Sequence, residues 1–295
     1  MRRKITLVFA AFAAMASTVW GQSAMPFLRA DRNPATSAMG GAQMTSSLYN
    51  PAAVPFGGSD IVLSYQSWAP AAAKATHVNL LAGVRLGEKL GITVLGAYQM
   101  GEPYQALDGS GNLGASFTPS ELVAGLGAGY AFTDALSAGA QVKFARMGIS
   151  QSSSYTAVAA DVYVMYAAGA LKVSGGISSI GTPVKSGDKS YGLPTSVTAG
   201  AGYDLVFGTS AVKVAADFDY FFSGGVGLGL GARYAFADMV FVRAGYHLGT
   251  DKAPIPSYAS LGAGFKWAGF HVDLSFLMAS ASLGNTLCVG LGYSF

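Results

Sequence analysis

The chain has 295 residues, of which 51% are hydrophobic and only 11% are charged, and 40 of them are glycine. Ordinary soluble domains carry about 25% charged residues, so most of the surface that such a domain presents to water is missing. The formal net charge of +3 equals the charge of Arg2, Arg3 and Lys4 alone. The rest of the chain is therefore neutral, which gives no reason to expect a nucleic-acid partner, and the single cysteine, Cys288, excludes an internal disulfide framework.

The N-terminus has the pattern of a secretory signal peptide. The basic "MRRK" is followed by the apolar run "ITLVFAAFAAMA", and small residues come next, as signal peptidases require. The sequence predicts cleavage after Gly21, so that residues 1–21 are removed and the mature chain begins at Gln22. With no cysteine near that point, a lipoprotein anchor is not expected.

Residues 22–59 form a turn-rich segment with two predicted short helical starts. In "NPATSAMGGAQM", Asn33 is placed to cap a helix whose first residue is Pro34, and in "YNPAAV", Asn50 and Pro51 repeat this arrangement. We expect this segment to fold as a plug inside the structure formed by the rest of the chain. The alternative is a disordered periplasmic tail, against which the segment's apolar residues argue: Phe27, Leu28, Met39, Met44, Leu48 and Tyr49.

Residues 60–295 read as a succession of long strands joined by alternating short and longer connections. The six short connections are residues 87–89, 132–134, 167–170, 207–210, 236–238 and 267–269. Strict alternation of tight turns and longer loops is typical of outer-membrane barrels, whose tight turns face the periplasm. The pattern predicts about fourteen antiparallel strands with both termini on the periplasmic side.

Aromatic residues recur at one depth of the predicted barrel. The hairpins "LGAGYAFTDALSAGAQV" and "LGARYAFADMVFVRAGY" are near repeats, and each places Tyr and Phe just before a short turn. The final strand, "TLCVGLGYSF", ends likewise on Tyr293 and Phe295. Such placement predicts an aromatic girdle at the membrane interface.

Alternation separates an apolar face from a face that carries charges and glycines. A Lys or Arg that faces lipid at mid-bilayer costs about 2–4 kcal/mol, so the charged face is predicted to line the lumen. There we expect a charge network that holds the plug, with Arg29, Asp31 and Arg32 as its partners. The predicted network residues are Arg85, Lys143, Asp161, Lys213, Asp217, Asp219, Arg233, Arg243, Lys266 and Asp273.

The predicted fold is therefore an all-β transmembrane antiparallel barrel at residues 60–295, with an N-terminal plug or hatch at residues 22–59. A water-soluble barrel or sandwich would explain the alternation equally well. It would not explain the signal peptide, the aromatic girdle, the low charge and the strand length together. Its strands would be about 5–6 residues long, whereas the strands here are about twice that.

The stretch "FLRADRNPATSAMGGAQ", the following "LYNPAAVPF" and the strand series ending in Phe resemble the PorV/PorQ family, part of the FadL-like group of outer-membrane barrels. The resemblance covers the whole mature chain. It implies a fourteen-stranded barrel with an N-terminal hatch that contains the Asn50-Pro51-Ala52 motif. The hatch residues that we single out are Asn33, Pro34, Gly40, Gly41, Asn50, Pro51 and Ala52.

No constellation in the sequence points to an enzyme, a metal site or a cofactor. The three histidines, His77, His247 and His271, all fall on the predicted lumen face, and no two of them share a strand at ligand spacing. Asp217 and Asp219 point the same way, but the nearby Lys213 suggests ion pairing rather than acid–base chemistry.

The resemblance implies a non-enzymatic outer-membrane factor that works with partner proteins in type IX-like protein secretion or surface assembly. The alternatives are a FadL-like passive transporter of hydrophobic small molecules and a structural barrel that the plug keeps shut. Expected contacts are outer-membrane lipid, secretion or assembly proteins, and a hydrophobic small molecule, with no nucleic acid. An apolar lumen pocket would favour the transporter.

Overall fold

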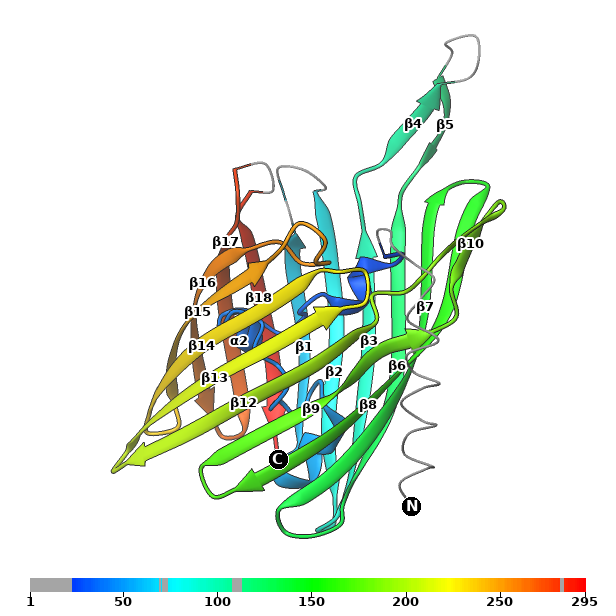
Figure 1. Ribbon diagram of the computed structural model, residues 1–295. Coiled ribbons are helices and arrows are strands. Elements are labelled where there is room, and N and C mark those ends of the chain that lie inside the picture. Colours follow the sequence, from blue (N-terminus) through cyan, green and yellow to red (C-terminus); the bar gives the residue numbers. More distant parts are fainter. Residues whose placement is uncertain (1–22, 69, 71–73, 108–112, 282–283) are drawn as a thin grey trace, which may run out of the picture.

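Fourteen antiparallel strands close into a barrel in the computed structural model (Figure 1). The structure describes residues 23–68, 70, 74–107, 113–281 and 284–295, so the predicted signal peptide lies outside the described residues. The barrel strands are β1 (Asp60–Trp68), β2 (Ala75–Leu86), β3 (Leu90–Met100), β6 (Ser120–Ala131), β7 (Leu136–Ser150), β8 (Ser153–Ala168), β9 (Leu171–Gly181), β12 (Ser196–Phe207), β13 (Ser210–Phe221), β14 (Val226–Phe236), β15 (Val240–Gly249), β16 (Tyr258–Trp267), β17 (Phe270–Met278) and β18 (Thr286–Ser294).

Each barrel strand pairs with the barrel strands that precede and follow it, and β1 closes the ring by pairing with β18. At this seam Ile61 lies opposite Tyr293, and Gln66 lies opposite Cys288. The predicted strand number and antiparallel order are confirmed, and all six predicted short connections separate consecutive strands. None of the helices in the described ranges is long and apolar enough to span a membrane.

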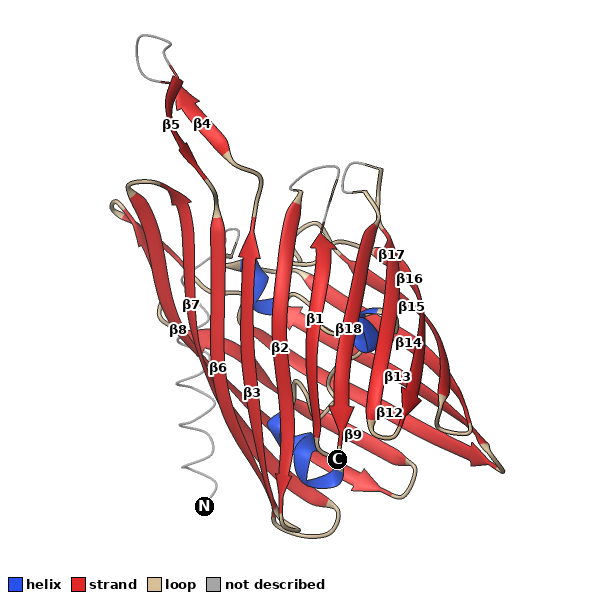
Figure 2. Cartoon of the chain, turned by 180° about the vertical axis from the view of Figure 1, so that it is seen from behind, coloured by secondary structure: helices blue, strands red, loops and turns tan. Residues whose placement is uncertain are grey.

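Two of the longer connections contain small hairpins where the sequence predicts only loops. The first hairpin is β4 (Tyr104–Leu107) with β5 (Leu113–Phe117), and it projects beyond the barrel end (Figures 1 and 2). The second is β10 (Val184–Ser186) with β11 (Lys189–Tyr191). The prediction of loops alone was wrong for these two connections, because strands of three to five residues are too short to show a strand period in the sequence.

The apolar face of the strands points outward, as predicted. Large hydrophobic side chains such as Leu63, Leu126, Val142 and Leu261 are more than half exposed on it. Exposed aromatic residues gather near the short turns, in agreement with the predicted girdle: Tyr130, Phe132, Tyr166, Tyr203, Phe207, Tyr234, Phe236, Phe265, Trp267, Phe270, Tyr293 and Phe295.

The one register irregularity between β8 and β9 is a β-bulge. Ala160 pairs with Ile180 and Val162 with Ile177, so β9 carries one extra residue. Within the bulge, Ser179 has a φ of 56° and its N–H donates to Asp161 Oδ1 at 2.7 Å. The bulge therefore directs the backbone N–H of Ser179 to the carboxylate of Asp161.

Residues 23–59, called here the N-terminal segment, lie inside the barrel (Figures 1 and 2). The segment contains three short helices: η1 (Pro26–Arg29), α2 (Pro34–Ser37) and η2 (Pro51–Phe56). Near the long-loop end, Ala24 N donates to Gly192 O at 2.8 Å. The α2 helix contacts β16, β17 and β18, and η2 contacts β2, β3, β6, β7 and β8. The segment thus runs through the lumen from the long-loop end to the short-turn end.

Candidate functional site

The first predicted hatch motif forms a capped helical turn against the barrel wall. Asn33 Oδ1 accepts a hydrogen bond from Ala35 N at 2.9 Å, and Pro34 is the first residue of α2. This is the predicted cap. The ring of Pro34 packs on Gly290 of β18, where any larger inward side chain would collide with it.

Gly40 and Gly41 turn the chain where the N-terminal segment lies close against the wall. Their φ angles are +68° and +75°, in the left-handed region that favours glycine. A Cβ on Gly40 would also collide with the carbonyl groups of Leu230 and Tyr246. Gly40 N donates to Ser260 Oγ at 3.2 Å. Backbone conformation and lack of space therefore both require glycine at position 40.

The second hatch motif is anchored by a buried asparagine. Asn50 is 1% exposed. Its Oδ1 accepts from Ala52 N at 2.9 Å, while its Nδ2 donates to Met44 O at 2.7 Å and to Ser174 Oγ of β9 at 2.8 Å. All of its side-chain hydrogen-bonding groups thus tie η2 to the wall and to the rest of the segment.

The wall is shaped to receive η2 at the short-turn end. Pro51 and Ala52 pack on Gly129 of β6 and Gly139 of β7, where a Cβ would collide with their backbone. Ser137 Oγ donates to Ala52 O at 2.5 Å. Inward-facing glycines therefore make the room that the N-terminal segment occupies.

Two of the predicted network carboxylates bind the N-terminal segment directly. Asp217 Oδ2 accepts from Gln43 N at 2.5 Å and from Met44 N at 2.7 Å. Asp219 pairs with Arg29 at 2.6 Å, with both side chains at most 16% exposed. These are the charge contacts through which β13 holds the segment.

The other predicted network residues pair within the wall or at the short-turn rim, so the ten residues do not form one network. Their contacts are Lys143–Asp161 at 2.8 Å, Arg243–Asp273 at 2.6 Å, Arg233–Asp204 at 3.9 Å, Lys266–Asp238 at 3.1 Å, Arg85 to the Gly87 and Glu88 carbonyls, and Lys213 opposite Asp204 and Arg233 in register. Arg32, an expected partner, instead donates to the carbonyls of Phe27 and Ala30.

The lumen contains an apolar chamber that the sequence analysis missed. Its walls are inward-facing hydrophobic side chains of β1, β2, β3, β6, β7 and β8, and the chamber is filled by Met25, Phe27, Leu28 and Leu48 of the N-terminal segment. The wall residues are Val62, Leu81, Leu95, Ala97, Val123, Ala145, Ala157 and Ala159, together with Val184 and Leu193 from the connection after β9. We call this set the apolar chamber.

A sequence signal for the chamber exists. The pairs Leu80-Leu81, Val94-Leu95 and Leu122-Val123 place apolar residues on both faces of neighbouring strands. The strands β2, β3 and β6, which supply the larger apolar wall residues, are therefore marked by a break in alternation. The rest of the lumen is polar, and a cavity of about 370 Å³ at the short-turn end is lined by Lys172, Lys213, Asp204 and other charged residues.

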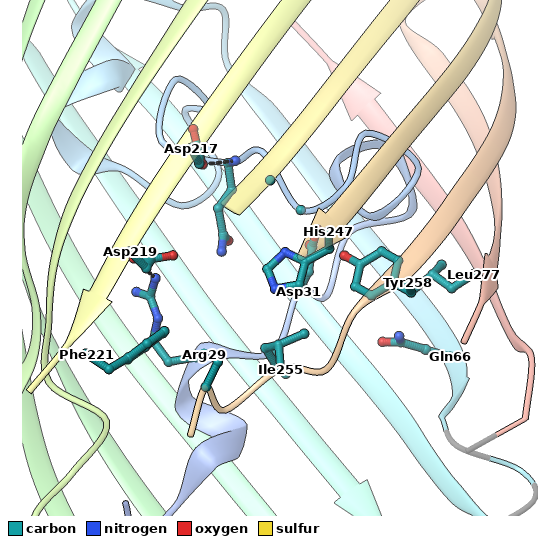
Figure 3. A pocket seen from close by; sticks show the side chains of 15 residues that line it. Arg29, Asp31, Gln66, Asp217, Asp219, Phe221, His247, Ile255, Tyr258 and Leu277 are labelled. Atoms are coloured by element: carbon teal, nitrogen blue, oxygen red, sulfur yellow. Dashed lines mark hydrogen bonds and ion pairs between the residues drawn. The ribbon is translucent and has the colours of Figure 1, made fainter. Parts of the chain in front are cut away.

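A smaller cavity of about 40 Å³ separates the N-terminal segment from β13 to β17 (Figure 3). We call it the polar cavity. Its lining includes Arg29, Asp31, Gln66, Asp217, Asp219 and Tyr258. The residues come from the segment and from strands on both sides of it, so the cavity exists only while the segment is in place.

The carboxylate of Asp31 is hydrogen-bonded through one of its two oxygens. Oδ1 accepts from Tyr49 Oη at 2.6 Å, from Thr36 Oγ1 at 2.7 Å and from Asn33 N at 3.1 Å. Oδ2 has no hydrogen-bond partner among the described residues. Burial raises the pKa of Asp31 above its usual value, and the donors to Oδ1 oppose that rise.

The three histidines lie apart from one another. His271 is held between Asp273 at 2.8 Å and Asp60 at 2.9 Å near the short-turn end. His247 stacks on Tyr258 and contacts Gly40 O, and His77 is buried on β2. In the described residues, no group of three or more His, Cys, Asp and Glu side chains could hold a metal ion.

The fold is that of FadL-like outer-membrane barrels. The CymD monoaromatic hydrocarbon channel matches with a TM-score of 0.62 and 14% sequence identity over 90% of this chain and 97% of that one. The Pseudomonas putida toluene transporter TodX matches with a TM-score of 0.55 and 15% identity, covering 88% and 96%. A Pseudomonas aeruginosa FadL homologue gives 0.53 and 11%, covering 90% and 98%. No protein-family model and no curated protein sequence matches the chain.

Proposed function

We propose that this protein is a non-enzymatic outer-membrane channel that passes hydrophobic small molecules, with the N-terminal segment as its plug. In this proposal the signal peptide directs export, the short turns face the periplasm, and the exposed apolar face contacts lipid. The observation that carries the proposal is the apolar chamber inside the barrel. A purely structural barrel has no need for a hydrophobic compartment in an otherwise polar lumen.

The contents of the chamber support a binding role. Phe27 is 7% exposed and sits among apolar wall residues. Burying such a side chain is worth about 1.5–3 kcal/mol. An apolar molecule of similar size that replaced it would recover about the same free energy from the same walls. The free-energy change when a substrate replaces the Phe27 side chain of η1 in the chamber is therefore close to zero, as passive transport requires.

The solved neighbours support the same function. Two of them are described as a monoaromatic hydrocarbon channel and a toluene transporter. They favour the transporter alternative over the secretion factor that the PorV/PorQ resemblance implies. The neighbours and the chamber offer no support for a secretion partner, so transport is the function proposed.

Uptake by cells tests this function. In a bacterium that lacks its own hydrocarbon channels, the full chain should raise the initial uptake rate of labelled toluene or of a long-chain fatty acid. Leu95→Asn places an amide without a partner in the chamber, which costs about 1–3 kcal/mol, and should lower that rate about tenfold. Leu95 is 8% exposed and belongs to the chamber wall.

Leu113→Asn is the matched control, because Leu113 lies on the projecting hairpin and is 69% exposed. Its uptake should equal that of the unaltered chain. Assembly of both variants is checked by heat-modifiable migration. Uptake no faster than in cells without the protein, or unchanged uptake by an assembled Leu95→Asn variant, would reject the proposal.

A further inference from the structure

The polar cavity presents buried oxygen atoms that have nothing to bind. Gln66 is 1% exposed and Asp217 is 6% exposed. Gln66 Oε1, Asp217 Oδ1 and Asp31 Oδ2 lack a hydrogen-bond partner among the described residues, and all three residues line the cavity. A buried polar group left unpaired costs about 1–3 kcal/mol. Asp217 Oδ1 lies against Gly200 of β12, so Gln66 Oε1 and Asp31 Oδ2 are the acceptors that point to a ligand that donates hydrogen bonds.

The charges that line the polar cavity also favour a ligand that donates hydrogen bonds. The cavity lining contains three carboxylates, Asp31, Asp217 and Asp219, and one guanidinium, that of Arg29. Counting Arg32, and with all three carboxylates ionised, one negative charge remains in excess, since Lys143 is already paired with Asp161. Burial raises the pKa of Asp31, because a buried charge without compensation is unfavourable. A cation bound beside Asp31 would favour its ionised form.

Polar atoms of three residues surround the side of Gly41 on which a Cβ would lie. The position that a Cβ would take there lies 3.1 Å from Tyr258 Oη and 3.9 Å from Asp31 Oδ2. His247 Nδ1, at 3.2 Å from Gly40 O, donates to that carbonyl and so holds its ring in place. Figure 3 shows Asp31, His247 and Tyr258 close together at this side of the cavity.

The size of the cavity limits the ligand. A site of about 40 Å³ exceeds the roughly 10–15 Å³ that one water needs, and so admits two or three heavy atoms. Its walls also carry apolar groups, Phe221, Ile255 and Leu277. A small group with N–H donors, a positive charge and a carbon atom fits these walls.

We propose that the polar cavity binds a primary ammonium group, with Asp31 Oδ2 as its counter-ion and Gln66 Oε1 as a further acceptor. Water would satisfy the acceptors but would leave the excess negative charge. The site is separate from the apolar chamber and does not depend on the proposed transport function. Because Asp31 belongs to the N-terminal segment and Gln66 to β1, bound ammonium would hold that segment against β1.

Calorimetric titration of the full chain in detergent micelles with methylammonium chloride tests the proposal. We expect saturable binding of one methylammonium per chain, and no comparable signal from sodium chloride or from tetramethylammonium, which has no N–H donors. Asp31→Asn keeps an acceptor for Tyr49, Thr36 and Asn33 but replaces the free oxygen by a donor. It should weaken binding at least tenfold.

Two further variants make the result decisive. Gln66→Leu should weaken binding several-fold without changing the charge. Asp238→Asn removes a carboxylate that pairs with Lys266 at the short-turn rim, and should leave binding unchanged. Equal responses to methylammonium and sodium, no saturable methylammonium binding, or binding unchanged in folded Asp31→Asn or Gln66→Leu would each overturn the proposal.

Discussion

Leu126→Arg should lower the free energy of unfolding in lipid vesicles by about 2–4 kcal/mol, the cost of a guanidinium facing hydrocarbon at mid-strand. Leu126 is 66% exposed on the outer face of β6. It pairs with Val94 on one side and Val142 on the other, so its neighbours are apolar too. Denaturant titration of the vesicle-inserted chain measures the change.

Leu113→Arg provides the control for this prediction. Leu113 is 69% exposed, as much as Leu126, but lies on the β4–β5 hairpin that projects beyond the barrel. Surface substitutions in water usually change stability by at most about 0.5 kcal/mol. If the two arginine variants lose the same stability, the outer face of β6 does not contact hydrocarbon.

Gly245→Val should displace the N-terminal segment. A Cβ on Gly245 would collide with the backbone of Met39 and Gly40, which cannot move aside as a flexible side chain can. Because β14 and β16 hold β15 on both sides, we expect the segment to yield rather than the wall. Trypsin should then cleave after Arg29 or Arg32, and single-channel conductance should rise several-fold.

Gly175→Val is the matched control, since the nearest atom to its added Cβ is Thr198 O at an ordinary 3.7 Å. It should resist trypsin and conduct like the unaltered chain. A Gly245→Val variant that assembles but stays protease-resistant and closed would show that the segment does not fill the lumen as a plug does.

The barrel was predictable because its strand signals are local. Alternation in β13 and β17, the six tight turns and the repeated aromatics each depend on residues close together in sequence. The caps formed by Asn33 and Asn50 are local signals too, and the structure contains both of them.

Contacts between distant residues were harder to predict. The sequence marks Asp217 and Asp219 as lumen charges, but gives no sign that Asp217 binds the backbone of Gln43 and Met44. The inward glycines indicate space, and the structure shows what fills it, as with Gly231 under Met39. The apolar chamber joins six barrel strands, and only the adjacent apolar pairs in β2, β3 and β6 record it locally.

The central claim is that a hydrophobic molecule enters the apolar chamber, and photolabelling tests it most directly. A diazirine-bearing aromatic hydrocarbon is photolysed with the membrane-inserted full chain, and the labelled residues are identified by mass spectrometry. We expect labelling of the inward-facing Leu81, Leu95 and Val123, and loss of that labelling when excess toluene is present. Labelling confined to outward-facing residues such as Val142 and Leu261, unaffected by toluene, would contradict it.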